Sequence, residues 1–259
     1  MKRLLPILTA LMLTALMAAC QSEADSPDWR PLLNGDDLSG WTVKFTGEDV
    51  GVNHRDTFQM VGEELRIDYS GWDSFDGRFG HIFTDTDYSA YDLRFEYRSY
   101  GEQVSGAPDW AYRNNGVLIH TQAPEDMARD QNFPVTLEMQ LVNGAGRSNG
   151  NICTPGTYVI LDGAPNRDHC IGSSHPEMPT EDWIAVRVET EANGEVRFYV
   201  EDQLTFKIDQ TLFEDGDIHM SGANTSGFTP DQPIRKGRIA FQAESHPTAF
   251  RNVEIRKRR

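Results

Sequence analysis

The feature that most constrains the fold is a short apolar or alternating run that ends in Gly, Asn, Asp or Pro and recurs along the chain. Such runs, with no helical periodicity sustained beyond two turns, are typical of strands joined by turns. The candidate strands are residues 41–45, 64–69, 91–100, 116–121, 135–142, 157–161, 183–189, 196–201, 204–208, 238–243 and 249–256. Asn193-Gly194 and Glu201-Asp202-Gln203 predict tight turns between neighbouring strands. Ten or more strands at this spacing, without internal repeats, predict a single all-β domain built as a two-sheet sandwich or jelly roll.

The candidate strand at residues 135–142 carries polar side chains on one face. Side chains alternate between the two faces of a strand. One face therefore presents Thr136, Glu138, Gln140 and Val142, and the opposite face is apolar. Glu138 and Gln140 project side by side from one pleated surface, and we interpret this surface as the wall of a groove.

Two further candidate strands offer polar residues on one face. One carries His120, with Gln122 continuing the same face, and the other leads into Gln242, Glu244 and His246. An antiparallel sheet commonly has one solvated face where such residues belong, so each cluster has that alternative explanation. All three clusters adjoin loop-rich segments and favour carboxylate, amide and imidazole groups. Imidazole and a desolvated carboxyl group titrate near neutral pH, which suits proton transfer beside bound sugar hydroxyls.

Two long segments are rich in loop-forming residues. Residues 143–179 are rich in Gly, Asn, Ser and Pro, and residues 215–236 have a similar composition. A loop of that length in a compact domain is more often a rim or a lid than a linker. The first segment contains Cys153 and Cys170. We expect a disulfide between them, worth roughly 3 kcal/mol on the chain-entropy model, rather than a two-cysteine metal site, which would lack further Cys ligands.

The N-terminal segment resembles a bacterial lipoprotein signal. Lys2 and Arg3 precede an apolar run at residues 4–19, which ends in small residues before Cys20. This order is typical of a secretory signal, and the run is too short to cross a membrane comfortably. Cys20 then corresponds to the acylated first residue of the mature lipoprotein. An ordinary cleaved signal with an incidental cysteine is the alternative.

This interpretation divides the chain into three parts. We expect residues 1–19 to be the signal peptide, residues 20–30 to be the lipidated Cys20 with its tether, and residues 31–259 to be the domain. Gln21 follows the cysteine where the inner-membrane retention signal has Asp. We therefore expect a lipoprotein of the bacterial cell envelope, in the outer membrane and facing the periplasm. An oxidising compartment also agrees with the disulfide.

A strong acidic excess limits the partners. The chain has 40 acidic and 24 basic residues and a formal net charge of -16. No basic surface remains for nucleic acid, and anionic membranes are unfavourable partners, so membrane contact is expected only through the lipid on Cys20. A small neutral saccharide fits this charge, and no obligatory protein partner is evident.

The strand of Glu138 can be compared with the active-site strand of sandwich-type glucanases. Those enzymes carry Glu-x-Asp-x-x-Glu, since retaining hydrolysis needs two carboxyl groups about 5 Å apart. The corresponding residues here are Glu138, Gln140 and Asn143. The second carboxylate is missing from this strand, so double displacement is disfavoured unless Glu244 supplies a partner from another strand.

Several segments, in one order over residues 29–257, resemble signatures of the 3-keto-disaccharide hydrolase family. These segments are residues 31–41 (PLLNGDDLSGW), 114–117 (NNGV), 137–140 (LEMQ), and 241–244 with 250–252 (FQAE and FRN). Residues 150–156, with the later His169-Cys170, are similar to a cysteine-bearing branch of this family.

The resemblance implies a concanavalin A-like jelly roll of two antiparallel sheets that cleaves 3-keto-glycosides. A carbonyl group at C3 acidifies the proton at C2, so a base can remove it and the glycosidic oxygen can leave by elimination, with water added afterwards. No glycosyl-enzyme nucleophile is then required. The reaction needs a base near C2, an acid at the leaving oxygen and a group that stabilises the enolate.

These needs lead to the expected roles. Glu138 is expected to be the base or a metal ligand, and His120 the acid or the donor to the enolate. Glu244 and His246 would form a second acid/base set. The residues expected to bind sugar hydroxyls are Asn115, Gln140 and Gln242. Arg251 is expected to orient Glu244 or Glu138, with a structural role on the terminal strand as the alternative.

No cofactor is required by this scheme. A divalent cation such as calcium, held by Glu138, His120 and Glu244, stays an open alternative that the spacing does not decide. Two other functions also remain open, because a fold does not fix a function. They are a non-catalytic saccharide-binding lipoprotein with a lectin-like fold and a conventional glycosidase.

Overall fold

The computed structural model describes residues 29–144, 146–179 and 181–258. The predicted signal peptide, Cys20 and most of the predicted tether lie outside the described residues. Within the described part, strands dominate, and the helical elements are the short 3-10 turns η1 (His54–Asp56), η2 (Asp109–Ala111), η3 (Pro124–Asp126) and η4 (Ile218–Met220). None of the described helices is long and apolar enough to cross a bilayer.

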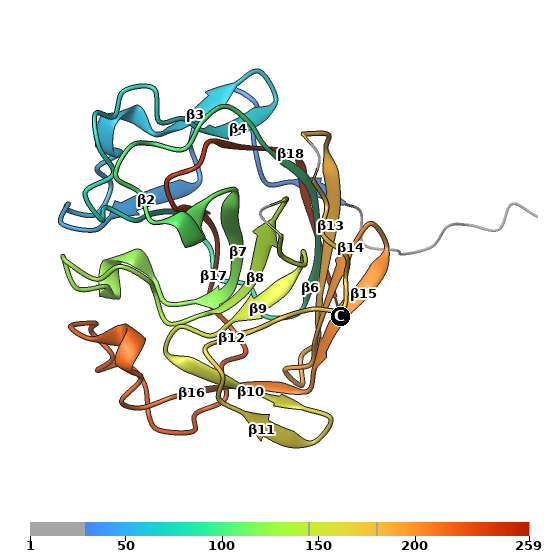
Figure 1. Ribbon diagram of the computed structural model, residues 1–259. Coiled ribbons are helices and arrows are strands. Elements are labelled where there is room, and N and C mark those ends of the chain that lie inside the picture. The colour runs from blue at the N-terminus through green and yellow to red at the C-terminus, as the bar shows by residue number, and fades with distance from the viewer. Residues whose placement is uncertain (1–28, 145, 180, 259) are drawn as a thin grey trace, which may run out of the picture.

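Two large antiparallel sheets pack face to face (Figure 1). The first, called the site sheet, has the order β12 (Cys170–Ile171), β9 (Asn151–Cys153), β8 (Leu137–Val142), β7 (Asn114–Thr121), β17 (Arg238–Ala243), β5 (Gly80–Thr84) and β2 (Trp41–Phe45). The second, called the back sheet, has the order β15 (Gln203–Ile208), β14 (Val196–Val200), β13 (Ile184–Thr190), β6 (Tyr91–Ser99), β18 (Thr248–Lys257), β4 (Glu64–Ile67) and β3 (Phe58–Val61), with β1 (Arg30–Pro31) paired to β18. A small third sheet contains β11 (Ala164–Asn166), β10 (Thr157–Leu161) and β16 (Gln210–Phe213). The predicted all-β, two-sheet jelly-roll sandwich is confirmed.

The core lies between the two large sheets and is rich in aromatic rings. Phe241 of β17 packs against Phe250 of β18, with ring centroids 4.3 Å apart, and against Phe95 of β6 at 5.3 Å. Full burial of one such side chain stabilises the fold by about 1.5–3 kcal/mol. On β8 the odd-numbered residues Leu137, Met139 and Leu141 enter this core. The even-numbered residues therefore point to the opposite, outer face of the site sheet.

Every strand predicted from the sequence is present, with ends displaced by a few residues. The tight turns are confirmed too: Gly194 has φ 96°, and Glu201 and Asp202 have φ 47° and 60°, as a two-residue hairpin turn requires. The sequence pattern missed β5, because all five of its residues are buried and its apolar pattern does not alternate.

Residues 143–179 are more regular than the loop predicted from their composition. They contain β9, β10, β11 and β12, each only two to five residues long. Strands this short leave almost no periodic signal in a Gly- and Asn-rich segment. The predicted disulfide between Cys153 and Cys170 is confirmed, and it joins β9 to β12 at a position where the two cysteines are register partners.

Candidate active site

A cavity of about 780 Å³ opens on the outer face of the site sheet. The sheet residues that line it include Asn114, Glu138, Gln140, Asn151 and Glu244. The loop residues that line it include Trp110, Phe133, Arg147, His169 and His219. Its size lies within the range of small-molecule sites, and apolar walls with a few polar groups are typical of such sites.

Glu138 lies on the floor of this cavity, over a glycine of the neighbouring strand. A Cβ atom added at Gly116 would lie 2.4 Å from Oε1 of Glu138 and 2.8 Å from its Cγ and Cδ. Real Cβ atoms essentially never approach other atoms that closely. The absence of a side chain at Gly116 therefore creates the space that the Glu138 carboxyl group occupies.

Glu244 lies beside Glu138 and comes from the segment that follows β17. Nδ2 of Asn114 donates a hydrogen bond of 2.7 Å to Oε2 of Glu244. Asn114 and Gly116 are two residues apart on one face of β7, a distance of roughly 7 Å along a strand. The two carboxyl groups thus occupy neighbouring positions over the same strand. Both glutamates are buried, with exposed fractions of 4% and 3%.

Burial and mutual repulsion favour the protonated forms of this pair. Burial raises the pKa of Glu138 well above its ordinary value, and the nearby charge of Glu244 raises it further. Burial also raises the pKa of Glu244 to about 8, while the positive charge of Arg147 opposes that rise. Ionisation is therefore easier at Glu244, next to a cation, than at Glu138. Near neutral pH the pair holds at least one proton and can exchange it.

Arg147 and Trp110 form one side of the cavity mouth. Nη2 of Arg147 donates to the backbone oxygen of Trp110 at 2.9 Å, which holds the half-buried guanidinium group at the cavity. The indole ring of Trp110 is 50% exposed and stacks on Phe79, with ring centroids 6.0 Å apart and planes 12° apart. A supported aromatic face at a cavity mouth is suited to stacking against a sugar ring.

The part of the cavity wall formed by β8, β9 and β12 is held by an amide network and the disulfide. Oε1 of Gln140 accepts a hydrogen bond of 3.1 Å from Nδ2 of Asn151 on β9. Oδ1 of Asn151 in turn accepts hydrogen bonds from Ser148 and Ser173. Cys153, the register partner of Glu138, carries the bond to Cys170 on the last strand of the sheet. The cross-link therefore fixes the strand that borders the catalytic candidate.

Among the residues predicted from the sequence, Glu138, Gln140 and Glu244 line the cavity together. His120 does not join them. A β-bulge shifts the register between β7 and β17 at this point, and His120 adopts φ 51°. Its ring turns to the other side of the sheet, edge-on to Tyr91 at 6.0 Å and hydrogen-bonded to the backbone oxygen of Ser89. Burial lowers its pKa to about 4, so the imidazole is neutral at physiological pH.

Three other predicted residues do not line the cavity. Asn115 faces the core side, and its Nδ2 donates to the backbone oxygen of Gln242 at 2.5 Å. The side chain of Gln242 is fully buried and has no hydrogen-bond partner within the described part of the chain. His246 is fully buried against Tyr112, and burial together with Arg113 lowers its pKa to about 4.

Arg251 lies on the back sheet, away from both cavity glutamates. Its Nε donates to Oε2 of Glu96 at 2.6 Å, and its guanidinium group lies 4.1 Å from the ring centroid of Trp183. The expectation that Arg251 orients Glu138 or Glu244 is therefore wrong, and the structural alternative holds. The alternative cation site formed by Glu138, His120 and Glu244 is wrong too, because the bulge turns His120 away from the two glutamates.

Several residues that line the cavity are not predicted by the sequence pattern. Trp110 lies in the short 3-10 turn η2 and Arg147 lies in an irregular loop, and neither segment has a periodicity from which the direction of a side chain could be predicted. Asn114 is the first residue of the NNGV segment, which carries the family resemblance but no predicted role for this side chain. The available signals were an aromatic residue just before a strand, and an isolated arginine in the Gly-rich segment predicted to form a rim.

Solved structures with a similar fold cover most of the chain. Two proteins named "putative glycosyl hydrolase", both from Parabacteroides distasonis, are 17% and 16% identical to it. Both alignments cover 89% of this chain, and they cover 94% and 100% of the other chains, with TM-scores of 0.50 and 0.52. A Bacillus subtilis protein with a galectin-like fold is 11% identical, with coverages of 89% and 94% and a TM-score of 0.50. At these identities the similarity establishes a shared jelly-roll fold.

Comparison at the level of sequence gives a more specific result. No curated protein matches the chain. The model of the 3-keto-alpha-glucoside-1,2-lyase-like domain matches residues 28–256, nearly the whole chain after the predicted signal peptide. This match confirms the resemblance found in the sequence segments, and the chain belongs to the 3-keto-alpha-glucoside-1,2-lyase-like domain family.

Proposed function

We propose that this protein cleaves 3-keto-glycosides by acid/base elimination followed by hydration. The observation that carries the proposal is the pair of buried carboxyl groups, Glu138 and Glu244, side by side on the floor of a cavity of about 780 Å³. Perturbed carboxyl groups in a cavity are typical of acid/base catalysis. Membership of a carbohydrate-active family supports a sugar substrate.

The electrostatic difference between the two carboxyl groups supports a separate role for each. Glu244, beside the cation Arg147, is the group that ionises more easily and acts as the base on the C2 proton. The electron pair of that C–H bond moves toward the C3 carbonyl oxygen and forms the enolate. Arg147 supplies positive charge next to Glu244 that stabilises the developing anion.

Glu138, expected from the sequence to be the base, keeps its proton near neutral pH and instead acts as the acid in this proposal. As the enolate collapses, the C1–O bond breaks, a C1=C2 double bond forms, and the leaving oxygen takes the proton of Glu138. Water then adds to C1 of the enone, and the Glu138 carboxylate accepts a proton from it. A proton returns to C2, and the free 3-keto sugar is released. No nucleophilic carboxylate is consumed in this sequence.

The roles can be separated with two leaving groups of different acidity. The test measures cleavage of 3-keto-trehalose and of a nitrophenyl 3-keto-glucoside by the native protein and by Glu138→Gln and Glu244→Gln, with Glu63→Gln on the exposed β3–β4 turn as the control. Nitrophenolate leaves without protonation. Glu138→Gln is expected to lose at least 100-fold on the disaccharide and far less on the nitrophenyl substrate, whereas Glu244→Gln loses activity on both.

Two outcomes would reject the proposal. Saccharide binding without turnover of any 3-keto substrate would indicate a lectin-like binding protein. Faster cleavage of the unoxidised nitrophenyl glucoside than of its 3-keto form would indicate a conventional glycosidase, with Glu244 as the second carboxylate that is absent from the strand of Glu138.

We also propose that the enzyme is held at the outer membrane, facing the periplasm, by a lipid on Cys20. The support is the sequence of residues 1–21 alone. Cells that express the full chain and are fed an alkyne-labelled fatty acid should yield labelled protein in the membrane fraction. Cys20→Ser should abolish both the label and the membrane association; an unlabelled native protein would contradict the anchor.

A further inference from the structure

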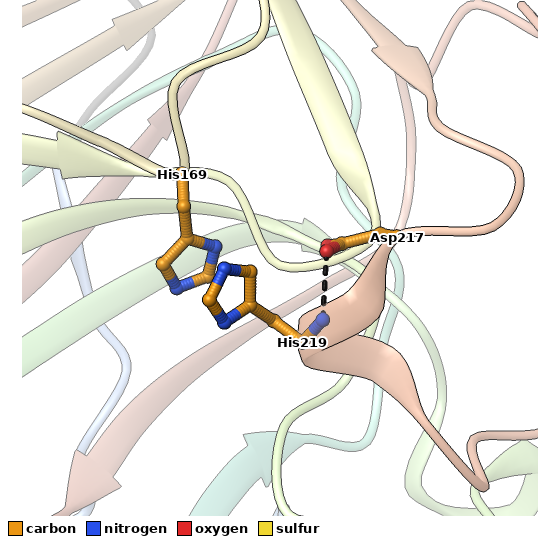
Figure 2. Close-up of side chains that lie close together, drawn as sticks. All are labelled: His169, Asp217 and His219. Atoms are coloured by element: carbon orange, nitrogen blue, oxygen red, sulfur yellow. Dashed lines mark hydrogen bonds between the residues drawn. The ribbon is translucent and has the colours of Figure 1, made fainter.

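Two histidines and an aspartate form a cluster at the edge of the cavity. His169 precedes β12, and Asp217 and His219 lie at the start of η4. Each residue offers one ligand atom, and these atoms all lie within 4.8 Å of one another. Figure 2 shows the two imidazole rings face to face, with the Asp217 carboxylate beside them. None of the three residues belongs to the acid/base pair.

The backbone holds Asp217 in place without using up its oxygens. Oδ2 accepts a hydrogen bond of 2.8 Å from the backbone nitrogen of Gly156, and Oδ1 accepts one of 2.9 Å from that of His219. Each carboxylate oxygen has a second lone pair available for another partner. Asp217 is thus oriented by two segments that are far apart in the sequence.

His169 presents a ring nitrogen that no other described residue uses, and His219 lies against its ring. Nδ1 of His169 is buried and has no hydrogen-bond partner among the described residues. The ring of His169 stacks on that of His219, with centroids 3.7 Å apart and planes 21° apart. His219 is exposed on η4, so a rotation about its side-chain bonds can direct a ring nitrogen toward the same point as His169 and Asp217.

We propose that His169, Asp217 and His219 bind a divalent first-row transition metal ion, with Zn²⁺ as the reference ion. Two imidazoles and one carboxylate are ligands that suit Zn²⁺ and its neighbours, whereas Ca²⁺ and Mg²⁺ require sites built from oxygen atoms. Three protein ligands leave at least one coordination position for water or a ligand. A site of this composition differs from the calcium site considered for Glu138, His120 and Glu244.

The location gives the ion access to the substrate cavity. His169 and His219 line the main cavity, and all three residues line an adjoining cavity of about 260 Å³. Adjacent hydroxyl and carbonyl oxygens of a keto sugar are a bidentate ligand for an ion with open positions. This further step rests on the proposed function, whereas binding of the ion does not.

The test uses Co²⁺ as a spectroscopic probe and Zn²⁺ for calorimetry, on the full mature chain without reductant, because free thiols of Cys153 and Cys170 would also bind these ions. We expect one equivalent of Co²⁺ to give visible d–d bands. His219→Ala and Asp217→Asn should each weaken binding at least tenfold. His219 is exposed, and Asn keeps one of the two acceptors that Asp217 offers to the backbone, so both variants should fold, which thermal unfolding checks. Asp215→Asn, in the same turn but outside the cluster, should bind within twofold of the native protein.

The outcomes separate this inference from the proposed function. No saturable Co²⁺ or Zn²⁺ binding, or equal binding by all three variants, would overturn the metal site even if 3-keto-glycosides are cleaved. Binding lost in the two cluster variants would support it even if no substrate is cleaved. In Glu138→Gln, addition of a 3-keto-glucoside should shift the Co²⁺ bands. An unchanged spectrum in the presence of bound sugar would refute contact between the sugar and the ion, but not the metal site itself.

Discussion

Gly116→Ala is the most informative single change at the candidate site. The added Cβ would lie 2.4 Å from Oε1 of Glu138, and ordinary contacts begin near 3.4 Å, so the carboxyl oxygen must move by about 1 Å. Its Cγ and Cδ, both at 2.8 Å, must move as well, which requires another rotamer. A misplacement of about 1 Å can reduce catalysis about 100-fold, close to 3 kcal/mol in the barrier. We expect kcat/KM on 3-keto-trehalose to fall by that factor.

The fold should tolerate this substitution. Gly116 lacks a positive φ, the three atoms nearest the added Cβ all belong to Glu138, and that side chain borders an open cavity. The matched control is Gly172→Ala, which lines the same cavity and has its nearest atom, Oγ of Ser148, at 3.9 Å. Thermal unfolding shows whether both variants are folded. A folded Gly116→Ala with activity within threefold of the native enzyme would refute the claim that the Glu138 position controls the reaction.

Three further predictions follow from the same contacts. Burial raises the pKa of Glu244 from 4.5 to about 8, so its contribution to the free energy of unfolding is complete below pH 4.5 and is lost as the pH rises to 8. In the native protein we expect this loss to be on the order of 4 kcal/mol between pH 5 and pH 9, measured by urea unfolding. Glu244→Gln should remove it. Replacing Cys153 and Cys170 by Ser should lower the unfolding free energy by about 2–4 kcal/mol and raise KM, since β9 borders Glu138; an unchanged KM would show that the cross-link does not shape the site. Arg251→Ala should leave kcat/KM within threefold and lower the free energy of unfolding by about 1 kcal/mol, because Arg251 pairs with Glu96 on the back sheet. A large loss of kcat/KM would show that Arg251 does act on the candidate site.

Periodicity predicts much of this fold because one physical cause, the burial of one sheet face, produces both the alternating sequence and the sandwich. It fails where that cause is absent. Strand β5 is buried at all five positions and therefore does not alternate. Strand β12, only two residues long, is held by pairing with β9 and by a disulfide, neither of which leaves a periodic pattern. Periodicity therefore could not predict the pairing of β12 with β9, although the two cysteines did predict the disulfide.

The candidate site was predictable where strands stay regular. Glu138 and Gln140 share a face because β8 alternates without interruption, and both reach the cavity. His120 would share the corresponding face of β7 if that strand continued in the same way. The bulge opposite β17 inserts one residue and reverses the direction of the side chain. The place of Arg147 at the cavity could not be predicted from the sequence, because it depends on a hydrogen bond to the backbone oxygen of Trp110, which is far away in the chain.

A buried acid elsewhere in the molecule differs from the cavity pair in how the cost of its burial is compensated. Asp92 of β6 is as buried as Glu138, but its carboxylate is in salt bridges with Arg256 and Arg258. That arrangement compensates the cost of burial within the protein itself. Neither Glu138 nor Glu244 forms a salt bridge within the described residues, and burial raises the pKa of both carboxyl groups. Two uncompensated carboxyl groups beside a cavity therefore agree with the acid/base role proposed for Glu138 and Glu244.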